Sequence, residues 1–222
     1  MRPKKRRKRR RMMILWKKLT KFVENQQQEH MRIIAARKED APLIGRAVTM
    51  AIGPELAREL AGPEHRPEDV EALFADLAAR EDSQYSYRNS LVALDGDGET
   101  VAGVLVCYDG EGLKRMRRVF FAEAAKRLGL DPGAPVDLLP EECGPDEFYL
   151  DSLAVWPEFR GRGIARALIE AGAGRARESG KPMGLLCDKT NTRARSLYDS
   201  LGFRQVGERP FAGELMDHMR LG

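Results

Sequence analysis

The sequence predicts an α/β fold in which helices cover the faces of a central sheet, and three observations support this prediction. In the second half of the 222-residue chain, apolar runs of strand length alternate with stretches of helical periodicity. The run 148–155 leads directly into a glycine turn and an apolar-periodic stretch, which is the order strand, turn, helix. Two Asp-Gly pairs at 95–98 separate two further apolar runs, a pattern typical of a β-hairpin.

The first half of the chain predicts a strand, two helices and that hairpin. Glu39 and Asp40 followed by Pro42 place acids and a proline where helices commonly begin, and the apolar side of this helix extends to about Ile52. Gly-Pro pairs then interrupt the chain before Pro67 opens the next helix. The expected elements are a strand at 31–37, a helix from about 42 to 52, a helix from 67, and hairpin strands at 91–94 and 101–108.

Residues 110–147 precede the next strand and divide into two parts. Apolar residues recur at helical spacing from Leu113 to Leu128, which predicts a helix packed on the body. The second part is rich in proline and ends in four acids, Glu141, Glu142, Asp146 and Glu147. We interpret this end as a solvated loop, and attraction of a cationic amine is the alternative. The elements expected afterwards are a strand at 148–155, a helix at 163–178, a strand at 183–188, a helix from 191, and strands at about 203–208 and 214–221.

The glycine turn after the 148–155 strand has the composition of a phosphate-binding loop. It reads Arg160-Gly161-Arg162-Gly163-Ile164-Ala165 and opens the following helix. Glycine permits positive φ and close approach of the backbone, while the first amides of a helix have no intrahelical partner and carry the positive end of its dipole. A pyrophosphate fits such a site, although glycine before a helix also serves tight packing.

A second motif follows at 191–203 and strengthens the interpretation of the glycine turn as a phosphate-binding loop. It begins at Asn191, a plausible N-cap, and ends at Gly202, a residue typical of helix C-termini. Apolar residues recur between them at helical spacing, which places Tyr198 on the apolar side of the predicted helix.

With both motifs in this order and spacing, the chain resembles the GNAT superfamily of acetyl-CoA-dependent N-acetyltransferases. The phosphate turn of that family matches Arg160, Gly163 and Ala165, and its pattern Asn-x-x-Ala-x-x-Leu-Tyr-x-x-x-Gly-Phe matches 191–203 in full. The resemblance implies the GNAT fold, a mixed, largely antiparallel twisted sheet of about seven strands flanked by helices, with splayed fourth and fifth strands. It extends over 31–222, and 110–147 is an insertion relative to the family pattern.

The resemblance also implies the roles of the site residues. Acetyl-CoA would lie between the splayed strands and transfer its acetyl group to a primary amine of a small molecule, peptide or protein. Tyr198 would protonate the coenzyme A thiolate, and Asp151 is our first choice of general base, with Tyr149 and Ser152 as residues that could position water instead. The expected cofactor contacts are Leu153, Ala154, Val155, Arg160, Gly161, Arg162, Gly163, Ile164, Ala165, Asn191 and Tyr198.

Charge divides the chain into two regions. Residues 1–30 hold 12 Lys/Arg and 2 Asp/Glu, whereas 31–222 hold 26 and 32, so a basic extension precedes a mildly acidic domain. We expect the extension to be disordered and without a role in catalysis. The alternatives are weak contact with nucleic acid or with an acidic membrane surface. A polyanion-binding protein that acts through this extension is accordingly one alternative function, and a non-catalytic acyl-CoA-binding or sensing module is another.

The cysteines and histidines suggest neither a disulfide framework nor a metal site. Cys107, Cys143 and Cys187 are odd in number, and we interpret Cys107 and Cys187 as small buried residues in strands. His65 and His218 are isolated in the sequence, so no metal is expected. No apolar run reaches the ~18 to 20 residues of a membrane span, and we expect a cytoplasmic location. The sequence leaves open whether the protein forms a homodimer.

Overall fold

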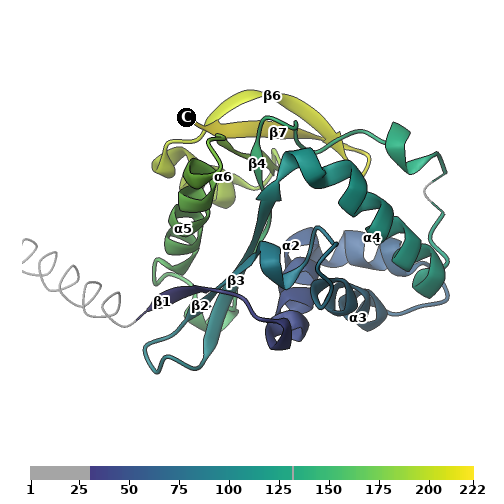
Figure 1. Ribbon diagram of the computed structural model, residues 1–222, viewed down its shortest axis with the longest axis horizontal. Helices are drawn as coiled ribbons and strands as arrows, with labels where there is room; N and C mark the ends of the chain where they lie inside the picture. The colour runs from purple at the N-terminus through teal and green to yellow at the C-terminus, as the bar shows by residue number, and fades with distance from the viewer. Residues whose placement is uncertain (1–30, 132) are drawn as a thin grey trace, which may run out of the picture.

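The computed structural model describes residues 31–131 and 133–222. The predictions made for residues 1–30, namely disorder and contact with nucleic acid or membrane, lie outside the described residues. Within the described part, strands and helices follow the predicted order, with a mixed sheet at the centre and helices on both faces (Figure 1). None of the described helices is long and apolar enough to cross a membrane.

The sheet has seven strands in the order β1-β2-β3-β4-β5-β7-β6. Only the pair β4 and β5 is parallel, and the other neighbours are antiparallel. The predicted mixed, largely antiparallel sheet is therefore confirmed. Its strands are β1 (Arg32–Ala35), β2 (Ser90–Leu94), β3 (Val101–Asp109), β4 (Phe148–Val155), β5 (Met183–Cys187), β6 (Arg204–Phe211) and β7 (Glu214–Leu221).

Two hydrophobic cores lie on the two faces of this sheet, because successive residues of a strand point to opposite sides. On β3, Val104 and Val106 pack in the core beneath α2 (Ala41–Ala61), α3 (Pro67–Ala78) and α4 (Leu113–Leu128). Leu105 and Cys107 pack in the core beneath α5 (Ile164–Glu178) and α6 (Thr192–Leu201). Figure 1 shows the two groups of helices on either side of the sheet.

Helix α2 is longer than predicted. Gly53 leaves the helical region with φ 81°, close to the expected end at Ile52, but a further helical segment then runs to Ala61. Pro54 starts this segment, where its missing amide hydrogen is tolerated. The Gly-Pro pair that predicts an end thus produces a kink, and the second segment borders the site described below.

Candidate active site

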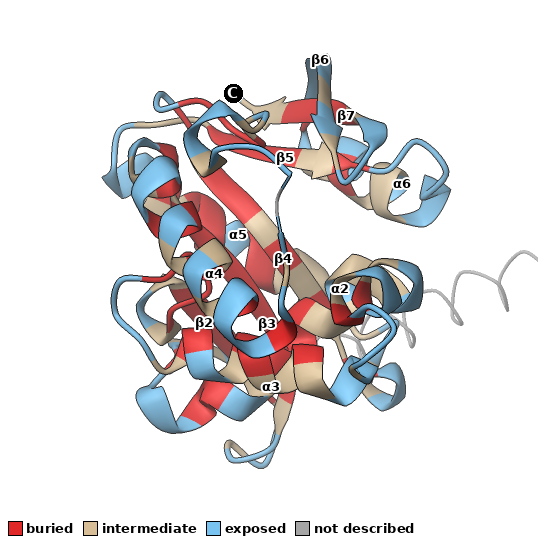
Figure 2. Cartoon of the chain, turned by 90° about the vertical axis from the view of Figure 1, so that its right-hand side faces the viewer, coloured by how far each residue is buried: buried red, intermediate tan, exposed pale blue. Residues whose placement is uncertain are grey.

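Strands β4 and β5 pair over three residues and then separate. The parallel pairs are Phe148 with Met183, Tyr149 with Gly184, and Leu150 with Leu185. Beyond them β4 continues to Val155 along β3, while β5 continues to Cys187 along β7. Figure 2 shows the two strands running apart, with α2 near β4 and α6 near β5. The predicted splay of the fourth and fifth strands is confirmed.

A β-bulge marks the residue at which the separation begins. Val106 of β3 pairs with Ser152, and the next residue, Cys107, pairs with Leu150, so Asp151 has no partner on β3. A bulge shifts the alternation of a strand by one residue and re-aims the side chain at that point. Asp151 lies at the mouth of the splay for this reason.

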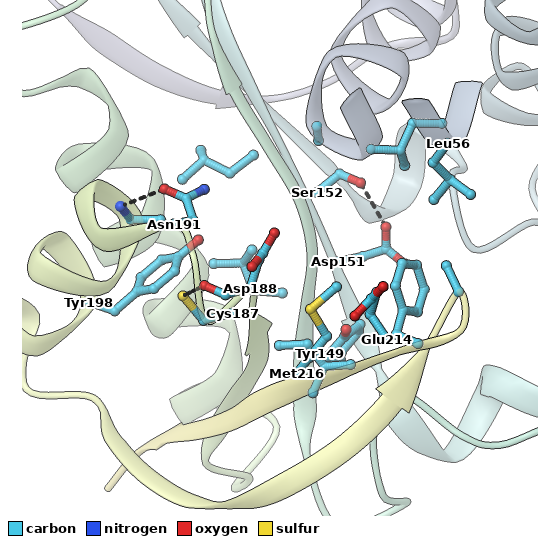
Figure 3. A pocket seen from close by; sticks show the side chains of 18 of the residues that line it. Leu56, Tyr149, Asp151, Ser152, Cys187, Asp188, Asn191, Tyr198, Glu214 and Met216 are labelled. Carbon is cyan, nitrogen blue, oxygen red and sulfur yellow. Dashed lines mark hydrogen bonds between the residues drawn. The ribbon is translucent and has the colours of Figure 1, made fainter. Parts of the chain in front are cut away.

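The space between the separated strands is a cavity of about 660 Å³, the first cavity below. Figure 3 shows Asp151 and Ser152 on one side of it and Asn191 and Tyr198 on the other. The charged side chains that line it are Glu55, Glu59, Asp151, Asp188 and Glu214. Among the residues that the structure describes, no lysine, arginine or histidine lines this cavity, so it favours a cationic ligand over an anionic one.

Asp151 is held by two neighbouring hydroxyls. The Tyr108 hydroxyl donates to Oδ2 and the Ser152 hydroxyl donates to Oδ1, each at 2.8 Å. Burial raises the pKa of the Asp151 carboxyl, and hydrogen bonds from Ser152, Tyr108 and Gln84 lower it in part. The result is a carboxylate with a higher affinity for a proton than an exposed aspartate has, which is the property a general base needs.

Tyr198 is 9% exposed and lies on α6 opposite Asp151. Burial raises the pKa of its phenol, and the nearby Cys187 raises it further. The hydroxyl therefore stays protonated at neutral pH and can donate its proton within the cavity. Asn191 caps the same helix, because its Oδ1 accepts a hydrogen bond from the Ala194 amide at 3.0 Å, which confirms its expected capping role.

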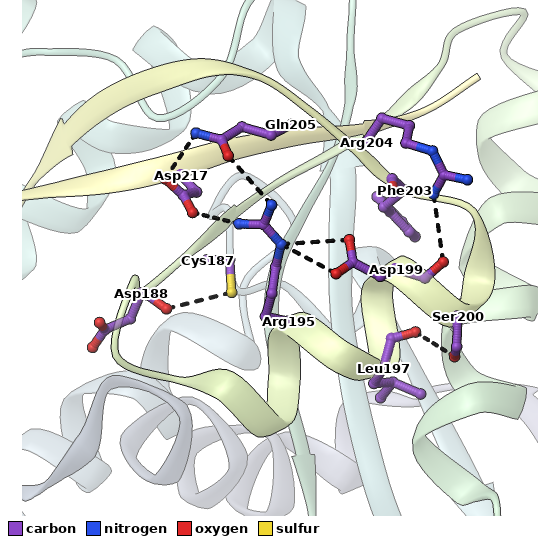
Figure 4. Close-up of polar contacts among 10 residues, drawn as sticks. All are labelled: Cys187, Asp188, Arg195, Leu197, Asp199, Ser200, Phe203, Arg204, Gln205 and Asp217. Atoms are coloured by element: carbon purple, nitrogen blue, oxygen red, sulfur yellow. Dashed lines mark hydrogen bonds and ion pairs between the residues drawn. The ribbon is translucent and has the colours of Figure 1, made fainter.

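Arg195 attaches α6 to the strands beside it. Its guanidinium forms an ion pair with Asp217 of β7 and contacts Asp199 and Gln205 (Figure 4). Asp217 is 8% exposed and also accepts a hydrogen bond of 2.9 Å from Gln205. These contacts fix the position of the helix that bears Tyr198 relative to the splayed strands.

The glycine turn leads into α5 as predicted. Gly161 and Gly163 both adopt φ 79°, and no side chain caps the start of the helix. The amides at the first helical positions, Ile164 and Ala165 among them, have no intrahelical acceptor, so they are suited to bind an anion.

The arginines of the turn already have partners. Arg160 Nε donates to the Val155 carbonyl at 3.1 Å, and Arg162 forms an ion pair with Asp95 of the β2–β3 hairpin. Arg166 donates to Ser200 Oγ at 2.7 Å. The backbone therefore offers the free donors at this turn, and phosphate contacts from these side chains stay a prediction.

Leu153, Ala154 and Val155 form the part of β4 that β5 has left. They pair with β3 at Leu105, Val104 and Gly103. Trp156 donates its amide to Ala102 of β3 at 3.0 Å, so by alternation the backbone groups of Val155 and Leu153 point toward the side that faces β5. An extended ligand can pair with the backbone there.

The expectation of a solvated loop is wrong for two of the four acids at the end of the insertion. Glu142 and Glu147 are buried at 6% and 0% exposure, not part of a solvated loop. Glu147 contacts His218 at 2.9 Å and Arg220 at 2.7 Å. Basic residues from distant segments lie beside both acids, Arg117 near Glu142 and His218 and Arg220 near Glu147, and no local pattern in the sequence indicates these contacts. No group of three or more potential metal ligands occurs in the described ranges.

Three further residues lie at the site although no motif in the sequence includes them, namely Tyr108, Gln84 and Tyr85. Tyr108 lies at the end of a predicted strand, and its contact with Asp151 spans 43 positions in the chain. Gln84 and Tyr85 lie in a turn-rich segment without periodicity. No local pattern distinguishes them. The three cysteines are free and buried, which confirms the interpretation of Cys107 and Cys187.

Comparison with known proteins agrees with this architecture. Residues 54–203 match the acetyltransferase (GNAT) family. A solved acetyltransferase shares 34% identity with a TM-score of 0.68, covering 85% of this chain and 97% of its own. An N-acetyltransferase from Staphylococcus aureus Mu50 shares 23% identity with a TM-score of 0.69, covering 85% and 99%. A protein from Salmonella typhimurium, solved with its cofactor acetyl-CoA, shares 19% identity with a TM-score of 0.50, covering 86% and 92%. No curated protein matches.

The fold and the family match define an acyltransferase enzyme. More specifically, the chain belongs to the acetyltransferase (GNAT) family, and acetyl-CoA is the cosubstrate that this family uses. The residues present fit that cosubstrate, because a helix start without a side-chain cap lies next to the segment of β4 that has no strand partner on the β5 side among the described residues.

Proposed function

We propose that the protein transfers an acetyl group from acetyl-CoA to a primary amine by direct attack. The observation that supports this proposal most strongly is the position of Asp151 and Tyr198 on opposite sides of one cavity at the splay. A proton acceptor and a proton donor thus face the same space. The excess of carboxylates around it favours an acceptor that arrives as a cation.

In this mechanism the splayed edge of β4 and the start of α5 orient the thioester. Bound acetyl-CoA supplies an activated acetyl group. The backbone of Leu153 and the amide of Val155 would pair with the extended arm, and one of these amides would polarise the thioester carbonyl. The amides at Ile164 and Ala165 bind the pyrophosphate.

The two side chains then move the protons. Asp151, directly or through a water positioned by Ser152 or Tyr149, accepts the proton that the ammonium form of the acceptor must lose. The nitrogen lone pair forms the new C–N bond as the C–S bond breaks. Tyr198 donates its proton to the departing sulfur. The second proton, which the nitrogen loses once the C–N bond has formed, restores the phenol through solvent, and Asp151 releases the first proton to solvent.

The test combines binding and turnover. Calorimetry with acetyl-CoA and with free coenzyme A measures binding, and thiol release in the presence of a panel of primary amines measures transfer. We expect heat with both forms of the cofactor and amine-dependent release of thiol. Binding without amine-dependent release would instead indicate a non-catalytic acyl-CoA-binding module, and the absence of binding to folded protein would exclude the proposal.

A further inference from the structure

A second cavity of about 540 Å³ adjoins the first one. The two share lining residues from α2, the 84–85 turn and the tip of the β6–β7 hairpin, namely Ile52, Leu56, Glu59, Tyr85, Phe211 and Ala212. The far wall of the second cavity comes from α4 and the segment after it, within the insertion predicted at 110–147. A ligand that enters the first cavity can therefore extend into the second.

The wall of the second cavity is largely apolar and includes five aromatic residues. Phe74 stacks on Phe120 with ring centroids 6.1 Å apart, and Tyr85 contacts both rings edge-on at 4.8 and 5.9 Å. Phe121 and Phe211 complete this lining. Such a wall favours an uncharged, apolar section of ligand, because burial of apolar surface is the dominant favourable term in binding.

Two of the residues that line the second cavity each hold a buried side-chain oxygen with no hydrogen-bond donor among the described residues. These oxygens are Oε2 of Glu142, which is 6% exposed, and Oε1 of Gln84, which is 2% exposed. A buried acceptor without a donor costs free energy, so a ligand that supplies donors there gains binding energy. The second cavity thus has a polar end within an apolar wall.

The charge of Glu142 is only partly balanced by the protein. Its Oε1 lies 3.8 Å from Arg117 Nη2, and that nitrogen also donates to the Pro140 carbonyl at 2.7 Å. Glu59 also lines the second cavity. Of the described residues that line it, Arg117 alone is basic. A protonated amine matches this arrangement, since an ammonium has three donors and no acceptor.

We propose that the second cavity binds the far end of the acceptor, which is a diamine with an apolar spacer whose second ammonium pairs with Glu142 and Gln84. The first amine then lies in the first cavity, between Asp151 and Tyr198, where it is acetylated. This inference rests on the proposed function and adds the class of substrate to it.

The experiment compares n-alkylamines with α,ω-diaminoalkanes of the same length, from four to ten carbons, by kcat/KM for thiol release at saturating acetyl-CoA. We expect the diamine to exceed its matched monoamine by about tenfold or more at the length that spans the two cavities, the range expected of a hydrogen bond to a charged group. Equal values for diamine and monoamine at every length would overturn the inference while leaving the proposed function intact.

The variant Glu142→Gln removes the charge and keeps the shape. We expect it to abolish the advantage of the diamine over its matched monoamine. The matched control is Glu141→Gln, because Glu141 pairs with Lys114 at 2.9 Å outside the cavity and should leave the advantage intact. Retention of the diamine advantage in Glu142→Gln would also overturn the inference.

Calorimetry of the best diamine with coenzyme A-loaded protein provides a readout that needs no turnover. We expect binding that Glu142→Gln weakens and Glu141→Gln does not. If no amine releases thiol, the proposed function fails, and this titration still decides whether the second cavity binds a diamine. Absence of diamine binding to the loaded wild-type protein would count against the inference.

Discussion

Tyr108 on β3 donates a hydrogen bond of 2.8 Å to Asp151 on β4, at the bulge where β4 leaves β5. Burial raises the pKa of Asp151, and the bonds from Ser152 and Tyr108 stabilise its charged form and counteract that effect in part. Asp151 acts as a base only when ionised, so activity falls as the pH drops through this pKa. We expect the acid limb of kcat/KM to lie above the ordinary aspartate value of about 3.9.

Replacement of Tyr108 with Phe tests this relationship. The variant loses a donor to the charged form of Asp151, so the pKa of Asp151 rises further and the acid limb moves to higher pH. A pH profile of kcat/KM measures the shift. Tyr87→Phe is the control, since the Tyr87 hydroxyl binds the exposed Glu81 and should leave the limb in place. If the acid limb of kcat/KM lies at the same pH in Tyr108→Phe as in the wild type, the pKa of Asp151 does not determine that limb.

Tyr198→Phe should separate chemistry from cofactor binding. The phenyl ring retains the packing against Phe203, whose ring centroid lies 5.7 Å away, and only the proton donor is lost. We expect kcat to fall by about hundredfold or more, the range of general acid catalysis, with unchanged affinity for acetyl-CoA. Thiol release and calorimetry measure the two quantities. Wild-type turnover in this variant would assign the proton donation to another group or to water.

Much of the fold could be predicted from local pattern. The apolar run of β4 and the helical periodicity of α4 are long and bounded by glycine or proline, and the structure gives both with the predicted bounds, Phe148–Val155 and Leu113–Leu128. The splay followed from the family resemblance, and its position at Leu150 and Leu185 required the structure. Periodicity decides which elements form, and the register between them depends on contacts between distant residues.

Less of the candidate site than of the fold could be predicted from the sequence. Asp151 and Tyr198 were identified because they fall within family motifs, whereas Tyr108 and Glu142 have no local signal. A glutamate in an acidic, proline-rich stretch ordinarily faces solvent, whereas Glu142 is buried beside Arg117 of α4. The surroundings that shape an acceptor pocket come from several segments and appear only when the chain is folded.

Arg195 should act as a positioning residue for Tyr198. Its side chain is 33% exposed, and it joins α6 to the nearly buried Asp217. We expect Arg195→Ala to lower the free energy of unfolding by about 1–2 kcal/mol, the value of a hydrogen-bonded charge reduced for partial exposure. It should also lower kcat more than it raises KM for acetyl-CoA. Urea unfolding and steady-state kinetics measure these effects. Arg193→Ala, an exposed neighbour on α6, should change neither.

Two glycines near and within α5 should respond oppositely to alanine. Gly161 has φ 79°, and a Cβ added there meets no atom within 4 Å, so the penalty of Gly161→Ala is conformational, about 1–2 kcal/mol. Gly174 lies inside α5, where a Cβ meets only the Arg177 side chain at 3.9 Å, so Gly174→Ala should stabilise the helix by about 0.5–1 kcal/mol.

The same two variants, Gly161→Ala and Gly174→Ala, test whether the glycine turn binds the pyrophosphate. Relief of the strain in Gly161→Ala requires the turn to change shape, which displaces the amides at the start of α5, so we expect weaker binding of coenzyme A in calorimetry. Gly174→Ala leaves the turn unchanged and should bind coenzyme A as the wild type does. If Gly161→Ala binds equally well while thermal unfolding confirms its loss of stability, the pyrophosphate is bound elsewhere than at this turn.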